Sequence, residues 1–241
     1  MPTDLPHPGG LIFDLDGTLV DTVQARIEGW VEALGEAGLS SGAGEIGPMI
    51  GMDGKRLARE VAEHGGRTLS EDEVEAIDHA AGAAFDRRNG APRPLPGLSE
   101  TLEAIERCGA SWLIATSSRA EQVRVSVAAL ELERQPDVVD GSHVRHAKPA
   151  PDLLLLAAER LGVPPAQCWA VGDSTWDVRA AVAAGMTPVG VSIGSAVGAD
   201  QLLEAGAAVV LPTLAALAEV LAEACSVRRR RHVTRGAPRR G

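Results

Sequence analysis

The stretch Leu11-Ile12-Phe13-Asp14-Leu15-Asp16-Gly17-Thr18-Leu19 places two carboxylates at the end of an apolar run. The run predicts a buried β-strand, and residues two apart on a strand project to the same side. Asp14 and Asp16 would therefore converge at the strand's carboxyl end. Acids held so close repel each other unless a cation or a shared proton offsets their charge. Because Mg²⁺ prefers such oxygen ligands, the stretch indicates a site of chemistry.

Further apolar runs recur along the chain, and helical patterns lie between them. The runs cover 11–15, 111–116, 168–172, 186–193 and 207–211, and the helical patterns cover 98–105, 123–130, 153–161 and 214–221. This alternation predicts an α/β fold, a doubly wound parallel sheet with helices on both faces. In such sheets, ligands bind beyond the carboxyl ends of the strands, where the strand order reverses.

Between the first and second predicted strands the alternation stops. Residues 22–90 carry helical patterns only, in three apolar stripes, and a proline-rich join over 91–97 leads back to the sheet. We therefore expect an inserted, all-helical cap domain that moves over the site. The expected boundaries are 22–92 for the cap, and 1–21 with 93–226 for a discontinuous core.

Charge and hydropathy limit which partners and which cellular location we expect. The formal net charge is −10, and removing the seven arginines between Arg228 and Gly241 leaves about −17. So acidic a body argues against nucleic acid as the main partner, and we expect 227–241 to be a disordered, arginine-rich tail. No apolar run is long enough to span a membrane, and the N-terminus does not resemble a signal peptide. We expect a cytoplasmic protein without a membrane partner; its oligomeric state is not predicted.

The three cysteines are odd in number and widely spaced. Cys108, Cys168 and Cys225 form no motif with one another or with a nearby histidine pair. The spacing therefore predicts neither a disulfide framework nor a zinc site.

Two later segments offer groups that bind anions. Thr116-Ser117-Ser118 follows the second predicted strand, although Ser and Thr also end many strands and cap many helices. Lys148 precedes a Pro-Ala-Pro turn and a leucine-rich helix. The prolines restrict the backbone and hold Lys148 on a stiff turn, although a lysine in this position is usually a solvated surface residue.

A fourth segment repeats the pattern of acids at a strand end. Gly172-Asp173 ends an apolar run, and Asp177 follows one helical turn later, so both acids face the same place. A helix start that favours aspartate for capping is the alternative explanation.

Taken in order, the four segments resemble the motifs of the haloacid dehalogenase-like (HAD) superfamily, in its phosphatase branch with a helical cap. Asp14-Leu15-Asp16-Gly17-Thr18 matches the first motif, Thr116 the second, Lys148 the third, and Gly172-Asp173 with Asp177 the fourth. The resemblance covers about residues 9–224, including the place of the cap.

The resemblance implies a reaction and a metal. Asp14 would attack phosphorus and form an aspartyl-phosphate, and Asp16 would protonate the leaving alcohol and then activate water. Mg²⁺ would be held by the carboxylates of Asp14 and Asp173 and by the backbone carbonyl of Asp16.

Four further residues would support that reaction. Thr116, Ser117 and Lys148 would bind phosphate oxygens and offset the charge that develops in the transition state. Asp177 would orient a metal-bound water or Lys148.

The implied substrate is a small phosphorylated metabolite, such as phosphoglycolate or a sugar phosphate. Dehalogenases of the superfamily lack the second aspartate, which is present here as Asp16. Beta-phosphoglucomutases usually have Glu-Asp where this chain has Gly172-Asp173, which favours water as the final phosphate acceptor. A phosphosugar mutase and a non-catalytic binding module remain alternatives.

The loop over 46–56 is the part of the cap that we expect to reach the substrate. Gly51 allows close backbone approach, and Lys55 or Arg56 could meet a carboxylate or hydroxyl-rich substrate. The alternative is a loop that leads into a helix and carries solvated basic residues. Lys55 could also be a Schiff-base amine, as in a phosphonate-cleaving relative, but no other residue supports that reading.

Overall fold

A parallel sheet forms the centre of the molecule. The computed structural model describes residues 5–235, and its six strands lie in the order β3-β2-β1-β4-β5-β6, with every neighbouring pair parallel. The strands are β1 (Gly10–Phe13), β2 (Ser111–Ala115), β3 (Val138–Val139), β4 (Cys168–Gly172), β5 (Thr187–Val191) and β6 (Val209–Leu211). The predicted fold class is confirmed, and the strand order reverses between β1 and β4.

Helices cover both faces of this sheet. They are α5 (Leu98–Cys108), α6 (Ala120–Ala128), α7 (Asp152–Leu161), α8 (Thr175–Ala183), α9 (Ala199–Glu204) and α10 (Leu214–Arg235), with short 3₁₀ turns η2 (Gly141–His143) and η3 (Pro165–Gln167). Leu11 and Phe13 of β1 pack in one core with α5, α6 and α10. Ile12 packs in a second core with α7 and α8. The alternating sides of one strand therefore divide the two cores.

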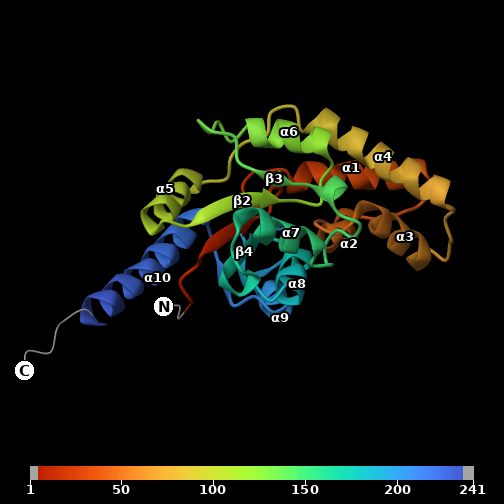
Figure 1. Ribbon diagram of the computed structural model, residues 1–241. Coiled ribbons are helices and arrows are strands. Elements are labelled where there is room, and N and C mark those ends of the chain that lie inside the picture. Colours follow the sequence, from red (N-terminus) through yellow and green to blue (C-terminus); the bar gives the residue numbers. More distant parts are fainter. Residues whose placement is uncertain (1–4, 236–241) are drawn as a thin grey trace, which may run out of the picture.

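Residues between β1 and β2 form a helical layer with a core of its own. It contains α1 (Val23–Glu36), α2 (Ala43–Ile46), the 3₁₀ turn η1 (Gly47–Met49), α3 (Gly54–His64) and α4 (Glu71–Arg88). We call helices α1–α4 the cap; Figure 1 shows them at one end of the molecule and α10 at the other. Their buried core includes Leu34, Leu57 and Val74, and Trp176 of α8 joins it. The sequence-based domain boundaries remain a prediction.

The two connections between cap and core run side by side. Val20 and Pro94 form an isolated antiparallel bridge. Asp21 N donates to Arg93 O at 2.9 Å, and Leu95 N donates to Leu19 O at 2.8 Å. These bonds bring the start and the end of the cap to one place on the core.

Two sequence-based expectations differ from the structure. Cys108 and Cys225 are disulfide-bonded, with Cα atoms 5.7 Å apart, whereas no disulfide was predicted. Their separation of 117 residues hides the pairing, which arises because α5 and α10 pack against each other. Helix α10 also continues to Arg235, so residues 227–235 of the predicted disordered tail are helical; residues 236–241 lie outside the described part. Within residues 5–235, no helix is both long and apolar enough to cross a membrane.

Two leucines of α7 test the core that supports the site. Leu153 is 0% exposed beneath the sheet, and Leu155 on the same helix is 41% exposed. Leu153→Ala should lower the free energy of unfolding by about 2–5 kcal/mol, because it removes buried contacts and leaves a cavity. Leu155→Ala should change it by no more than about 0.5 kcal/mol. Urea unfolding followed by circular dichroism measures both, and equal losses would contradict the packing described here.

Candidate active site

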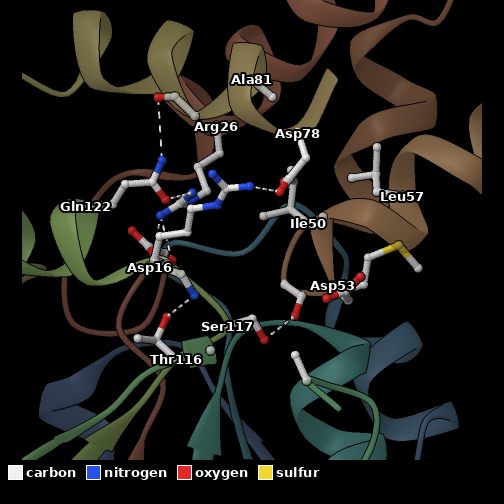
Figure 2. A pocket seen from close by; sticks show the side chains of 18 of the residues that line it. Asp16, Arg26, Ile50, Asp53, Leu57, Asp78, Ala81, Thr116, Ser117 and Gln122 are labelled. Atoms are coloured by element: carbon white, nitrogen blue, oxygen red, sulfur yellow. Dashed lines mark hydrogen bonds and ion pairs between the residues drawn. The ribbon is translucent and has the colours of Figure 1, made fainter. Parts of the chain in front are cut away.

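A cavity of about 550 Å³ lies between the carboxyl ends of the strands and the cap. Figure 2 shows Thr116 and Ser117 at the sheet side of this cavity, with Asp16 and Gln122 on one flank and Asp53 and Leu57 on the other. The predicted residues that line it are Asp14, Asp16, Thr116, Ser117 and Asp173 from the core, and Gly51 and Lys55 from the cap.

Three buried acids surround one buried lysine at the floor of this region. Asp14, Asp173 and Asp177 each place a carboxylate oxygen within 4.8 Å of the others. Lys148 is 1% exposed; its Nζ pairs with Asp14 Oδ1, lies 2.7 Å from Asp177 Oδ1 and donates to Ala115 O at 2.9 Å. The structure thus brings together residues that directly follow β1 and β4, a residue in the first turn of α8, and a lysine on the turn before α7.

The electrostatics of this cluster leave an excess of negative charge. Burial raises the pKa of Asp14 to about 7, against the opposing effect of Lys148, and the carboxylates of Asp177 and Asp16 add to the increase. Burial, then Asp177 and Asp14, raise the pKa of Asp173. Burial disfavours the Lys148 ammonium, but Asp14 and Asp177 outweigh it and raise the pKa of this lysine.

These observations fit a divalent metal site. One ammonium faces three carboxylates, so a further cation would relieve their repulsion, and a set of buried carboxylate oxygens suits Mg²⁺. Asp14 and Asp173, the two predicted carboxylate ligands, belong to this set together with Asp177; their binding of a metal remains a prediction. The carboxylate of Asp16 is engaged elsewhere, which leaves its backbone carbonyl as the predicted ligand.

Asp16 lies in a separate hydrogen-bond network on the cap side. Its Oδ1 accepts from Thr22 Oγ1 at 2.7 Å, and its Oδ2 accepts from Arg26 Nη2 at 2.8 Å and from Ser118 Oγ at 2.6 Å. Burial alone would raise the pKa of Asp16, but Arg26, with the hydroxyl groups of Ser118 and Thr22, lowers it below its usual value.

Sequence reasoning missed Arg26 altogether. The residue lies on the apolar stripe of α1, three positions after Val23 and four before Trp30. A charged residue on a stripe that faces the interior was the available signal.

Two glycines allow the first and fourth motifs to pack together. Gly17 has φ +83°, and a Cβ there would lie 2.4 Å from Asp173 Oδ2. A Cβ at Gly172 would lie 2.3 Å from Asp177 Cβ. Thr18 Oγ1 then donates to Asp173 Oδ1 at 3.0 Å, which holds that carboxylate against the first motif.

The predicted phosphate-binding hydroxyls lie at the end of β2. Thr116 is buried, and its Oγ1 accepts from Ser118 N at 3.1 Å. Ser117 Oγ donates to the carbonyl of Gly51 at 3.4 Å, which links the core to the cap loop. Both residues line the cavity, and their contact with phosphate remains a prediction.

The two basic residues of the cap loop differ in their position relative to the cavity. Lys55 lines the cavity and pairs with Glu75. Arg56 is not among the residues that line it; its guanidinium pairs with Glu60 at 2.6 Å and lies 5.3 Å from the ring centroid of Trp176. The structure therefore gives no support to Arg56 as a substrate contact.

A family profile described as haloacid dehalogenase-like hydrolase matches residues 9–185. The chain belongs to this family. Curated relatives of this HAD-like hydrolase include the fructose-1-phosphate phosphatase YqaB of Escherichia coli K12, 33% identical over 76% of this chain and 96% of the relative. The phosphoglycolate phosphatase of the same strain is 31% identical over 77% of this chain and 81% of the relative. The expected enzyme class, a phosphatase of the HAD-like family, is confirmed.

Solved structures show the same architecture. A hydrolase from Pseudomonas syringae superposes with a TM-score of 0.83 at 31% identity, over 89% of this chain and 98% of that chain. A putative beta-phosphoglucomutase from Bacteroides vulgatus superposes with a TM-score of 0.81 at 22% identity, over 92% of this chain and 91% of that chain. The second likeness shows the fold alone.

The raised pKa of Asp14 predicts how stability depends on pH in EDTA. Asp14 has a pKa of about 7 in the folded protein and about 3.8 in the unfolded chain. Between these two pH values the folded protein binds the proton and the unfolded chain does not, so the free energy of unfolding falls as pH rises. The melting temperature in EDTA should therefore drop between about pH 4 and about pH 7, and the drop should be smaller in Asp14→Asn. Mg²⁺ should raise the melting temperature more at the higher pH, where the carboxylates are ionised.

A surface acid supplies the control for this prediction. Asp200 is exposed on α9, and Asp200→Asn should follow the wild-type pH profile. A drop of equal size in the wild type and in Asp14→Asn would show that Asp14 is not the source.

Proposed function

We propose that the protein is a Mg²⁺-dependent phosphomonoester hydrolase that acts on a small phosphorylated metabolite through an aspartyl-phosphate. The observation that carries this proposal is the position of Asp14, a buried carboxylate on the floor of the cavity, paired with Lys148 and beside Asp173 and Asp177. A nucleophilic carboxylate, a fixed cation and further acids within reach of one cavity suit phosphoryl transfer.

In this proposal Asp14 attacks phosphorus while Lys148 fixes its carboxylate. The Lys148 ammonium is itself held by Asp177 and by the Ala115 carbonyl, so it needs no reorganisation when the substrate binds. Thr116 and Ser117 donate to the phosphate oxygens. Water then attacks the phosphorus of the aspartyl-phosphate, which returns Asp14 and releases phosphate.

Asp16 acts as the acid and base in the same proposal. It gives a proton to the leaving oxygen and later takes one from the attacking water. Mg²⁺ would be held by Asp14, Asp173 and the backbone carbonyl of Asp16, and would supply positive charge that lets a dianionic phosphate approach the acids.

Phosphoglycolate and sugar phosphates are the proposed substrate classes. Curated relatives are named for each of them, and a cavity of about 550 Å³ leaves room for a leaving group beyond the phosphate. A phosphosugar mutase is the alternative, in which a sugar in place of water receives the phosphoryl group. Every carboxylate of the four motifs is present, which disfavours a non-catalytic binding module. The cytoplasm stays the predicted location.

Asp14→Asn should abolish turnover while the fold persists, because the amide cannot attack phosphorus. We expect kcat for p-nitrophenyl phosphate with Mg²⁺ to fall on the order of 10³-fold or more in this variant. EDTA should abolish the phosphatase activity of the wild type. Phosphate release and a circular dichroism spectrum measure these effects. Full activity in EDTA, or in the variant, would refute the proposal.

Metabolite substrates separate the hydrolase from the mutase. Phosphoglycolate and fructose 1-phosphate should each be tested for phosphate release, and a hexose 1-phosphate should be tested with a bisphosphate activator. Isomer interconversion with little net phosphate release would support the mutase, and Asp200→Asn should match the wild type in every assay.

A further inference from the structure

Arg26 joins the cap to the acid of the core. It lies on α1, and its side chain is 14% exposed. Its Nη2 donates to Asp16 Oδ2 at 2.8 Å and to Ser118 Oγ at 2.6 Å, and its Nη1 donates to Gln122 Oε1 at 3.3 Å. The guanidinium also lies 3.9 Å from the ring centroid of Phe85. Figure 2 shows Arg26, Asp16 and Gln122 together on one flank of the cavity.

This arrangement fills both acceptor positions of Oδ2 of Asp16. Oδ2 accepts two hydrogen bonds, from Arg26 and Ser118, and Oδ1 accepts one from Thr22. A carboxylate oxygen has two lone pairs, so Oδ2 has no free position for a leaving group or a water. Oδ1 keeps one free position, so at least one donor must leave before Oδ2 can exchange a proton with the substrate.

Arg26 is the donor on the cap, whereas Ser118 belongs to the core. If Arg26 leaves Asp16, a largely buried guanidinium needs another acceptor, since an unpaired buried charge is strongly unfavourable. Two acids of α4 that line the cavity already have partners: Asp78 pairs with Arg119, and Glu75 with Lys55. An oxygen of the bound substrate would supply such an acceptor.

We propose, resting on the proposed hydrolase, that Arg26 selects leaving groups with an oxygen substituent close to the phosphate-bearing carbon. The guanidinium exchanges Oδ2 of Asp16 for a hydroxyl or carboxylate oxygen of the bound substrate. This exchange opens Oδ2 of Asp16, which can then take up a proton from water and pass it to the leaving oxygen. Arg26 is thus a specificity-determining residue, and its partner exchange couples recognition of the leaving group to release of the acid.

The geometry of Arg26 suits such an exchange. Its flat guanidinium lies against Phe85, and it offers several donors in one plane. A substrate oxygen that enters the cavity can therefore be met without loss of the aromatic contact or of the bond to Gln122. Bonds from a guanidinium to an oxygen acceptor are also stronger than bonds between neutral groups, which gives the exchange its selectivity.

Matched substrates test the proposal directly. Glycerol phosphate and n-propyl phosphate have the same chain length and differ in the hydroxyl groups; phosphoglycolate and ethyl phosphate form the pair for a carboxylate. The ratio of kcat/KM within each pair should favour the oxygen-bearing substrate. In Arg26→Met this ratio should fall by about tenfold to 100-fold, as expected for one charge-assisted hydrogen bond.

Two further variants separate recognition from structural support. Arg26→Lys keeps the charge and should recover part of the selectivity. Arg87 is a cap arginine that pairs with Glu32 and does not line the cavity, so Arg87→Met should leave both ratios at the wild-type value. For Arg26→Met, KM for glycerol phosphate should rise, and KM for n-propyl phosphate should stay within about twofold.

The outcomes are distinct. An equal loss for both members of a pair, or unchanged ratios in Arg26→Met, would overturn the role of Arg26 while the hydrolase stands. A wild type that releases no phosphate from these substrates or from p-nitrophenyl phosphate would overturn the proposed function, and the role of Arg26 with it.

Discussion

A buried ammonium among buried carboxylates is the constraint that shapes this molecule. Lys148 cannot remain charged in the interior without Asp14 and Asp177, and these acids cannot remain so close without Lys148. With Asp173 added, the acids still outnumber the cation. Each needs backbone placed within a narrow tolerance, which rigid parallel strands provide and loops alone do not. The sheet thus serves to hold charges that would otherwise separate.

The acids divide into two electrostatic environments. Asp14 and Asp173 lie where burial and neighbouring carboxylates raise the pKa, whereas Arg26 lowers the pKa of Asp16. Asp14 and Asp16 are two residues apart on one strand end, yet they have different partners. Without a metal this division is the reverse of what the proposed reaction needs, because a nucleophile works ionised and an acid works protonated. A divalent cation beside Asp14 would favour its ionised form, and departure of Arg26 would raise the pKa of Asp16. The division arises because Arg26 reaches Asp16 from another layer of the fold.

The architecture and the floor of the site were predictable because strands and their terminal acids are local signals. Asp14, Thr116, Lys148 and Asp173 each follow or precede a recognisable apolar run. Contacts between distant helices leave no such trace. The Cys108–Cys225 bond depends on how α5 meets α10, and the Arg119–Asp78 pair depends on how the cap lies on the core. The two-residue strand β3 is too short to show a period. Contacts between different layers of the fold can be read only from the three-dimensional structure.

The paired connections at Val20 and Pro94 have a consequence for how this chain can diversify. The whole segment between these two residues is attached to the core at one place. An insert of another length or shape would need only two adjacent anchor points, and the strand ends beneath would keep their register. Selectivity for a metabolite and the machinery for cleaving its phosphate can therefore be inherited as separate modules.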